Sequence, residues 1–402
     1  MKNIKLTNEQ INLIEQMKQM RHCILTADTG TGKTIISINA SVGNTLAIVP
    51  NKELKKQWEE YSISNMQICT YTECSKFDYL SKKFETIIID EAHKVNQSSN
   101  RTKTCVKCVL DIKPTYLYLM TATPLIKHES DLLNMVLRYK MKVPLKSLKM
   151  TKKALQQDFF IADESFNFIF NRYQTDFFDL KHERADEFKS LINLLSLKHD
   201  KFSVFKEKID FKGYLCEEYK LLKKEKYSNV LDKSANGLIR ANYLHQLSNN
   251  LLKIPEHLIT NDKYYGNADN LILKIDFIKK NILTKHKRII IVYNFNAELE
   301  CLKKNFEKYT ENKDEFNINS NLRIFFRQFN KAEGINMPDV NTIVWVTYGF
   351  SSVAFEQMHG RVTRQNSLNN NVYYYYLVCS NNVESKIFDV ITKRITKNKM
   401  IK

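Results

Sequence analysis

The chain has 402 residues, of which 43% are hydrophobic and 26% are charged, so it is long enough for two or three globular domains. Its formal net charge of +18 favours a polyanionic partner, although the lysine-rich and asparagine-rich composition of an A/T-rich genome gives the same excess. No apolar run reaches the roughly 18 residues of a membrane span and the N-terminus lacks a secretory signal, which excludes an integral membrane protein and predicts a cytoplasmic or otherwise intracellular one.

A strand, a glycine-rich loop and a helix are predicted in CILTADTGTGKTIIS, residues 23–37. Glycines in such a loop let backbone N–H groups turn toward a polyphosphate. Lys33 supplies a positive charge for the phosphates, and Thr34 supplies a hydroxyl for Mg²⁺. A glycine-rich turn without a ligand is the alternative, because Ala27 stands where the general phosphate-loop pattern has its first glycine.

Two further strands end in residues that suit the same site. In FETIIIDEAHKVN, a β-branched apolar run is followed by Asp90 and Glu91. Open α/β sheets bind ligands at the carboxyl ends of their strands, where Asp90 can hold Mg²⁺ through water and Glu91 can deprotonate an attacking water. The strand in TYLYLMTATP ends in Thr121 and Thr123. Alternating strands and helices predict a doubly wound parallel sheet.

Only one of the cysteine spacings in the chain is of the C-x-x-C type, at Cys105 and Cys108. A zinc site normally needs a second pair of cysteine or histidine ligands, and none lies close by in the sequence. Two thiols on one face of a helix are therefore the favoured interpretation.

Residues 141–262 carry no phosphate or metal motif, and their apolar residues follow a helical period. They predict a helical insertion. Phenylalanines interleaved with lysines in this segment could stack on single-stranded nucleic acid, but a core of the insertion's own is the favoured interpretation.

The last third of the chain repeats the strand-to-helix pattern in KRIIIVYNFNAELE. About a dozen residues separate that helix from the next strand, RIFF, which is too few for a further strand and helix. FEQMHGRVTRQN then contains Gln357, Arg361 and Arg364. Two arginines three apart on one helical face can reach a single phosphate group. A basic helix on a solvated surface is the alternative.

In this order the motifs resemble those of superfamily 2 helicases and translocases with a DEAH-type box. The phosphate loop of that superfamily is commonly A-x-x-G-x-G-K-T, and this sequence matches every fixed position with Ala27, Asp28, Thr29, Gly30, Thr31, Gly32, Lys33 and Thr34. RIFFRQFNKAEGINMPDVNTIVWV resembles the family's motif V, with Gly334 in its core. The resemblance covers residues 1–140 and 265–402. EEYKLLKKEKY and VYYYYLVCSNNVESKIFDVI are similar to segments of Swi/Snf-type translocases, and phage and viral helicases share several of these features.

The resemblance implies an α/β fold with two RecA-like doubly wound parallel-sheet domains, residues 1–140 and 263–402, and the helical insertion between them. The two domains are expected to face each other across a cleft that binds ATP and Mg²⁺. Thr34 and Asp90 would hold the metal, Gln10 would recognise adenine, and Thr121 and Thr123 would couple the nucleotide state to domain movement. A solvated helix position is the alternative for Gln10. The expected catalytic residues are Glu91, Gln357, Arg361 and Arg364.

The implied activity is that of an ATP hydrolase, a helicase or translocase that acts on nucleic acid. DNA is favoured over RNA, in replication, repair or recombination, and a type III restriction translocating subunit is a variant of this hypothesis. The alternatives are an RNA helicase and a non-motor clamp or scaffold. The protein is expected to be a monomeric motor without a membrane partner, to work with replication or repair proteins, and to have a bacterial, phage or viral origin.

Overall fold

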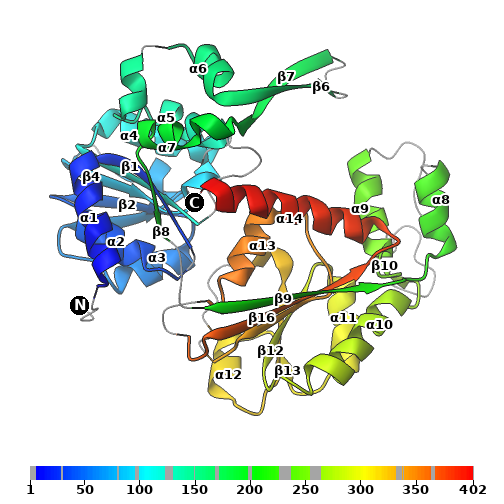
Figure 1. Cartoon of the computed structure of the whole chain (residues 1–402). Coiled ribbons are helices and arrows are strands. Elements are labelled where there is room, and N and C mark those ends of the chain that lie inside the picture. The colour runs from blue at the N-terminus through cyan, green and yellow to red at the C-terminus, as the bar shows by residue number, and fades with distance from the viewer. Residues whose placement is uncertain are drawn as a thin grey trace. The chain divides into compact units, whose positions relative to one another are not determined.

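The computed structural model describes residues 6–28, 30–78, 81–95, 99–122, 130–148, 150–167, 172–197, 202–225, 237–253, 264–331, 337, 339–363 and 367–401. The chain divides into two compact units: a first unit of residues 1–199 with 397–402, and a second unit of residues 200–396. Each unit is built on one six-stranded sheet with helices packed against it (Figure 1).

The sheet of the first unit has the strand order β3-β2-β4-β5-β1-β8, and all of its neighbouring strands are parallel. Its strands are β1 (His22–Ala27), β2 (Thr45–Val49), β3 (Met66–Thr70), β4 (Thr86–Ile89), β5 (Tyr116–Thr121) and β8 (Leu194–Leu197). Its helices are α1 (Asn8–Met20), α2 (Lys33–Ala40), α3 (Lys52–Glu59), α4 (Asn100–Ile112), α5 (Ser130–Arg138), α6 (Lys152–Phe159) and α7 (Ala185–Leu191). A separate antiparallel hairpin is formed by β6 (Phe160–Asn167) and β7 (Arg172–Leu180).

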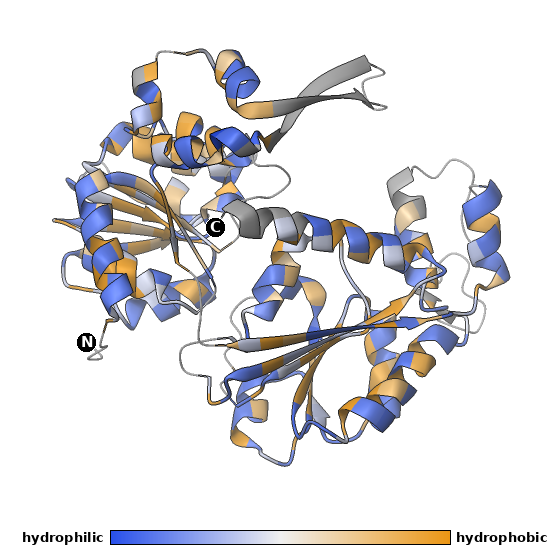
Figure 2. Ribbon diagram, viewed as in Figure 1, coloured by the Kyte–Doolittle hydropathy of each residue, from blue (hydrophilic) through white to orange (hydrophobic). Residues whose placement is uncertain are grey.

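Both faces of this sheet are covered by apolar cores. Successive residues of β1 face opposite sides, so Ile24 packs in one core, whereas Cys23 and Leu25 pack in the other. All six residues of β1 are buried, including the polar His22 and Thr26, as expected for a strand that is covered on both faces. Figure 2 shows these hydrophobic strands between helices that carry hydrophilic residues.

The sheet of the second unit has the order β13-β14-β12-β15-β16-β9 and is also parallel throughout. Its strands are β9 (Ser203–Phe211), β12 (Ile289–Tyr293), β13 (Tyr309–Thr310), β14 (Ile324–Gln328), β15 (Thr342–Trp345) and β16 (Asn371–Cys379). The helices of this part of the chain are α8 (Glu217–Glu225), α9 (Gly237–Leu247), α10 (Asp269–Phe277), α11 (Asn296–Asn305), α12 (Lys313–Ile318), α13 (Ser352–His359) and α14 (Val383–Ile401). A short antiparallel pair consists of β10 (Leu252–Lys253) and β11 (Tyr264–Tyr265).

Single-turn helices complete the described elements. Five are of the 3₁₀ type: η1 (Glu73–Ser75), η2 (Ala92–Val95), η3 (Pro144–Leu148), η4 (His182–Arg184) and η7 (Phe329–Lys331). A π-helical turn, η6 (Ile278–Ile282), continues α10. Two parallel six-stranded sheets with flanking helices confirm the predicted α/β fold class of two doubly wound domains. Within the described ranges, no helix combines the length and the apolar composition needed to cross a bilayer.

The segment between the two predicted domains is not helical throughout. It contains β6, β7, β8 and β9 besides its helices, and β8 and β9 each extend a large sheet through β1 and β16 respectively. The helical period of DEFKSLINLLSLKHD corresponds to α7 only, because LLSL has the alternating burial of an edge strand. The prediction of a helical insertion is wrong in this respect, and the division of the chain at residues 140 and 262 stays a prediction.

The short connection before β14 also differs from expectation. It holds both a strand and a helix, since β13 pairs in parallel with β14 and α12 follows β13. The prediction that the segment is too short for both elements is wrong, because the strand has only two residues and the helix only six. The second sheet is therefore as wide as the first.

Cys105 and Cys108 lie one turn apart on α4, and both are fully buried in the same core as Cys69 and Cys74. This agrees with two thiols on one helical face. Across the described residues, no group of three or more His, Cys, Asp or Glu side chains is arranged to hold a metal ion.

Candidate nucleotide-binding site

The glycine-rich loop begins where β1 ends, at Ala27, and runs directly into α2. Gly30 has φ 85° and Gly32 has φ 89°, a backbone conformation that residues with a Cβ rarely adopt. The hydroxyl of Thr31 donates to the carbonyl of Asp28 at 2.8 Å and closes the loop. The glycine-rich residues therefore fold into a closed loop at the N-terminus of α2. Backbone N–H groups at the N-terminus of a helix favour an anion. Thr29 lies outside the described residues.

Lys33 is the first residue of α2, and its side chain folds over the loop. Its Nζ donates to the carbonyls of Ala27 at 2.7 Å and Asp28 at 3.1 Å. Thr34 follows in the first turn of the same helix and is half-buried. The ammonium group and the hydroxyl therefore lie at the helix end that faces the loop.

Gln10 is buried in α1, with 3% of its surface exposed, so the alternative of a solvated helix position is wrong. Its Nε2 donates to the carbonyl of Thr31 at 2.8 Å, and its Oε1 accepts from the backbone of Thr7 in a capping box. Gln10 therefore ties the start of α1 to the glycine loop. Its proposed contact with adenine is a separate role that these bonds do not test.

Asp90 follows β4 and is 6% exposed. One carboxylate oxygen accepts from the indole N–H of Trp58 at 3.0 Å, and the other accepts from the backbone N–H of Glu91 at 2.9 Å. Burial and the neighbouring Glu91 carboxylate raise the pKa of Asp90 to about 6, against the opposing effects of Trp58 and Lys33. Asp90 follows β4, which belongs to the same parallel sheet as β1, the strand before the glycine loop.

Glu91 has a left-handed backbone, with φ 48°, which costs free energy for a residue that carries a Cβ. The hydroxyl of Tyr71 donates to the backbone carbonyls of both Asp90 and Glu91 and holds this turn in place. The Glu91 carboxylate lies 3.3 Å from Nδ1 of His93, and the same nitrogen lies 2.8 Å from the hydroxyl of Thr121. Burial lowers the pKa of His93 to about 4, so its ring is neutral near pH 7.

The order of the strands explains why these residues meet. In the sheet, β5 lies between β4 and β1, and the three strands are parallel, so their carboxyl ends share one edge. Lys33, Asp90, Glu91 and Thr121 all follow or end these strands. This is the edge at which open α/β sheets bind ligands. Thr123 lies outside the described residues.

The residues present fit ATP with Mg²⁺. Mg²⁺ is normally held in nucleotide sites by one or two carboxylates together with the phosphates and water, rather than by a cage of protein ligands. Asp90 keeps a lone pair on each oxygen beyond the bonds described above, and Thr34 supplies a hydroxyl. The loop offers N–H groups and an ammonium group for the phosphates.

The predicted residues of the second unit are only partly described. Gln357 and Arg361 are both buried, at 3% and 7% exposed, and Nε of Arg361 donates to the backbone carbonyl of Gln357 at 3.0 Å. Helix α13 ends at His359, and Gly360 caps it, so Arg361 lies in the turn after the helix. The prediction that both arginines share one helical face is therefore wrong for Arg361. Arg364 and Gly334 lie outside the described residues.

Sequence reasoning missed three residues of the first site: Trp58, Tyr71 and His93. His93 stands in the quoted motif, three positions after Asp90, but its contact with Thr121 depends on the neighbouring strand. Trp58 and Tyr71 come from other elements and are brought to Asp90 only by the fold. Nothing in their local sequence marks them.

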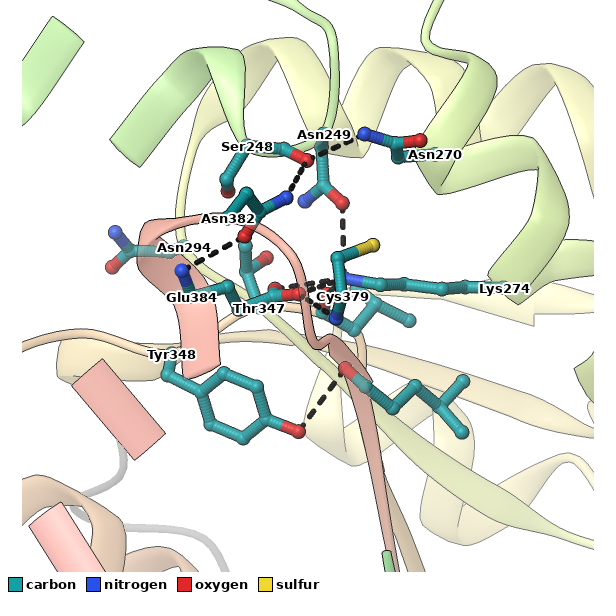
Figure 3. A network of polar contacts seen from close by, with 12 residues as sticks. Ser248, Asn249, Asn270, Lys274, Asn294, Thr347, Tyr348, Cys379, Asn382 and Glu384 are labelled. Carbon is teal, nitrogen blue, oxygen red and sulfur yellow. Dashed lines mark hydrogen bonds and ion pairs between the residues drawn. The ribbon is translucent and has the colours of Figure 1, made fainter. Parts of the chain in front are cut away.

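A buried polar network at the carboxyl edge of the second sheet was also missed (Figure 3). Lys274 is fully buried, and its Nζ lies 2.7 Å from a carboxylate oxygen of Glu384, which is also fully buried. The same Nζ donates to the carbonyl of Val346 at 2.6 Å and to Asn249 at 3.0 Å. Glu384 also accepts from the backbone N–H of Cys379 at 2.7 Å. The network therefore joins α10, β16 and α14 to the residues that follow β15 and α9.

Comparisons with known proteins point to one class. Residues 3–77 match the model of the family described as "Type III restriction enzyme, res subunit". The chain is 30% identical over 148 residues to "Putative helicase 109L" of Invertebrate iridescent virus 3, which covers 29% of this chain and 43% of that protein. It is 29% identical over 182 residues to "Putative ATP-dependent RNA helicase L538" of Acanthamoeba polyphaga mimivirus, which covers 42% of this chain and 39% of that protein.

The matches to these two relatives thus span less than half the length of each. Among solved structures, the "Sulfolobus solfataricus SWI2/SNF2 ATPase core in complex with dsDNA" aligns with 99% of this chain and 93% of its own. The identity is 17% and the TM-score is 0.40.

Proposed function

We propose that the chain is an ATP-dependent helicase or translocase of superfamily 2 that acts on nucleic acid. The observation that carries this proposal is the convergence of Lys33, Asp90 and Glu91 on one edge of a parallel sheet. A glycine loop with its lysine, beside two carboxylates after a neighbouring strand, suits a magnesium-bound triphosphate. The family match over residues 3–77 and the names of the viral relatives support the same class. A DEAH-type box at residues 90–93 is part of the proposal.

The residues of the first unit would divide the chemistry as follows. The N–H groups of the loop and the ammonium group of Lys33 would bind the phosphates, and Gln10 would recognise adenine. Thr34 and Asp90 would hold Mg²⁺, which when bound neutralises charge on the phosphates. Glu91 would orient and deprotonate the attacking water, with its carboxylate positioned by His93.

Further roles fall to residues whose contacts with a nucleotide are untested. Arg361 and Arg364 would stabilise the charge that develops in the transition state of hydrolysis. Gln357 would take part in catalysis, and Gly334 would approach the nucleotide through its backbone. Thr121 and Thr123 would couple the nucleotide state to movement.

DNA is the proposed nucleic acid, in replication, repair or recombination. The resemblance of residues 217–227 and 372–391 to Swi/Snf-type segments supports duplex DNA, and the charge of +18 suits phosphate contacts in general. RNA is the second candidate, because the mimivirus relative is named as an RNA helicase. We propose a monomeric motor that works inside the cell with replication or repair proteins.

The test is ATP hydrolysis by the full chain with single-stranded DNA, duplex DNA, forked DNA and RNA, compared side by side at several salt concentrations. Hydrolysis should rise with the true nucleic acid, and its binding should weaken steeply as salt increases. Lys33→Ala should abolish hydrolysis. Equal rates with and without every nucleic acid would exclude a motor, and tight ATP-dependent binding without stimulated turnover would favour a non-motor clamp.

A further inference from the structure

Trp58 on helix α3 donates a hydrogen bond to the carboxylate of Asp90. Of the eight residues of α3, all of them described, Trp58 alone is buried. It is 1% exposed, and its Nε1 lies 3.0 Å from one carboxylate oxygen of Asp90, which is 6% exposed. An indole N–H can only donate and an ionised carboxylate can only accept, so the direction of this bond is fixed. Asp90 holds Mg²⁺ in the proposed function, which makes the bond from Trp58 a contact with a metal-binding group.

The carboxylate of Asp90 is held at both of its oxygens. The oxygen that Trp58 leaves free accepts from the backbone N–H of Glu91 at 2.9 Å. With one donor on each oxygen, rotation of the carboxylate would break at least one of the two bonds. Water replaces a lost donor poorly at a buried group, so such a rotation is costly. The remaining lone pair of each oxygen is therefore oriented before any ligand arrives.

Trp58 and Tyr71 hold the turn at Asp90 from opposite faces of the sheet. Trp58 packs in the same core as Ile88, whereas Tyr71 packs in the core that contains Ile89, the next residue of β4. The hydroxyl of Tyr71 donates to the backbone carbonyl of Asp90. Tyr71 therefore fixes the backbone of the turn, and Trp58 fixes the side chain.

The bond from Trp58 orients the carboxylate without neutralising it. Both donors to the Asp90 carboxylate, an indole N–H and a peptide N–H, are uncharged. A lysine or arginine in the place of Trp58 would offset the negative charge that attracts a divalent cation. Hydrogen-bond partners that orient metal-binding groups typically contribute about 10- to 100-fold to metal affinity. An uncharged, buried donor therefore suits a carboxylate that binds Mg²⁺.

We infer that Trp58 is a positioning residue for the metal site: its indole N–H holds the Asp90 carboxylate in the orientation that binds Mg²⁺ together with ATP. The inference rests on the proposed function, because it requires Asp90 to bind the metal. Trp58 acts through Asp90 and needs no contact of its own with the metal or the nucleotide. Its ring also anchors α3 in the core, so the hydrogen bond has to be tested separately from the packing.

Trp58→Phe removes the N–H group and keeps an aromatic ring in the core. The measurement is equilibrium binding of a fluorescent ATP analogue to the full chain, titrated with Mg²⁺ and repeated with the metal chelated. The Mg²⁺ concentration that gives half-maximal binding should rise at least about tenfold. Binding of the nucleotide without Mg²⁺ should stay unchanged, because the glycine loop and Lys33 are intact.

Trp345→Phe is the matched control. Trp345 is fully buried in a core of the second unit, and its indole N–H has no acceptor in the part of the chain that the structure describes. The same substitution at this position should leave the Mg²⁺ requirement unchanged. If Trp58→Phe weakened nucleotide binding equally with and without Mg²⁺, Trp58 would have a packing role only, and the proposal would be overturned.

The fluorescence of Trp58 gives a second readout, which does not depend on whether Trp58→Phe folds. The chain has two tryptophans, Trp58 and Trp345, so the tryptophan emission of Trp345→Phe comes from Trp58 alone. Excitation at the red edge of the absorption band avoids the tyrosines. Adding Mg²⁺ to this variant with ATP bound should change the emission, because charge drawn from the Asp90 carboxylate weakens its bond with the indole.

The positioning role and the proposed function fail in different ways. If the parent chain showed no Mg²⁺-dependent binding of nucleotide, the proposed function would be wrong, and this inference with it. If the parent chain bound nucleotide with Mg²⁺ and Trp58→Phe had the same Mg²⁺ requirement, only the positioning role would be overturned. Emission from Trp58 that does not respond to Mg²⁺, in a chain whose nucleotide binding depends on Mg²⁺, would overturn it as well.

Discussion

Nδ1 of His93 lies 2.8 Å from the hydroxyl oxygen of Thr121. His93 follows β4 and Thr121 ends β5, so this contact joins the carboxyl ends of two adjacent strands. The same nitrogen is 3.3 Å from the carboxylate of Glu91. Glu91 and Thr121 therefore both lie next to the same nitrogen of one imidazole ring.

This contact predicts energetic coupling between His93 and Thr121. His93→Ala and Thr121→Val should each lower nucleic-acid-stimulated hydrolysis several-fold with little effect on ATP affinity. The double variant should be little worse than either single variant, with a coupling energy of about 1 kcal/mol in a double-mutant cycle. Strictly additive losses would mean that the two residues act independently. His93→Asn, which keeps a nitrogen near Thr121, is the conservative control.

Glu91→Gln should retain ATP binding while hydrolysis falls by a factor of roughly 10² or more, the scale of losing a general base. The measurement is single-turnover hydrolysis beside equilibrium binding of a labelled ATP. Glu85→Gln is the matched control, because Glu85 is exposed at the opposite, amino end of β4. Normal hydrolysis by the Glu91 variant would remove this residue from the role of base.

Arg361→Ala and Arg364→Ala should each lower turnover on the order of 10³-fold while nucleic acid stays bound, because a cationic finger acts mainly in the transition state. Lysine at either position should restore little, since a point charge cannot make a forked contact. The exposed Arg101 provides the control, as Arg101→Ala. Near-normal rates with weakened nucleic-acid binding would identify the segment as a nucleic-acid surface instead.

The site and the fold differ in how far local sequence predicts them. The positions of the glycines at 30 and 32 in a loop and of the carboxylates at 90 and 91 after a strand could be predicted, because they depend on residue type and on the strand just before them. Strand β8 could not be predicted, because LLSL becomes a strand only by pairing with β1, about 170 residues earlier in the chain. The turn at Gly360 shows the same limit, because i,i+3 spacing indicates a shared face only while the helix continues.

The contacts of buried polar residues were the least predictable. Lys274 and Glu384 look like ordinary charged helix residues in the sequence, yet both are completely buried. Their pairing depends on two helices and the ends of two strands that meet only in the folded chain. No local period distinguishes them from solvent-exposed positions.

Glu384→Gln should destabilise the second unit by about 3–5 kcal/mol, because it leaves the Lys274 ammonium group buried without its counter-charge. Urea unfolding at pH 7 measures this. Glu311→Gln, which breaks a partly exposed pair with Lys303, is the control and should cost less than about 1 kcal/mol. A double change, Lys274→Met with Glu384→Leu, should recover much of the loss, since the charges are then removed together. A Glu384→Gln variant as stable as the parent chain would show that the pair contributes nothing.

Stability should fall as the pH is lowered from about 6.5 to 4. Nδ1 of His22 accepts from the backbone N–H of Lys142 at 3.0 Å, and burial together with the Lys142 charge lowers the pKa of His22 to about 4. An unfolded histidine takes up a proton near pH 6.5, so below this value protons favour the unfolded chain by about 1.4 kcal/mol per pH unit for this residue. The contribution is fully present above pH 6.5 and lost as the pH falls.

Urea midpoints at pH 7.5, 6.0 and 5.0 test this. In His22→Asn, the side-chain oxygen can accept the same bond. This variant should take up about one proton fewer on unfolding, so its free energy of unfolding should depend less steeply on pH. Burial lowers the pKa values of His93 and His245 to about 4, and these residues should account for the remaining dependence of stability on pH. If stability depended on pH in the same way in His22→Asn as in the parent chain, His22 would be excluded as a source of acid lability.

The pairing of β8 with β1 also determines when the first unit can finish folding during synthesis. The backbone N–H of Asp28, at the start of the glycine loop, donates to the carbonyl of Leu197, and the hydroxyl of Thr26 donates to that of Leu195. These bonds close a separation of about 170 residues, and pairing at such long range forms slowly. A nascent chain that has emerged only to residue 140 carries every residue of the phosphate loop, yet β1 is still an open edge strand. A ribosome stalled before residue 194 should therefore display the loop without the strand that fixes Asp28, so the proposed binding of a nucleotide would begin only after β8 has been synthesised.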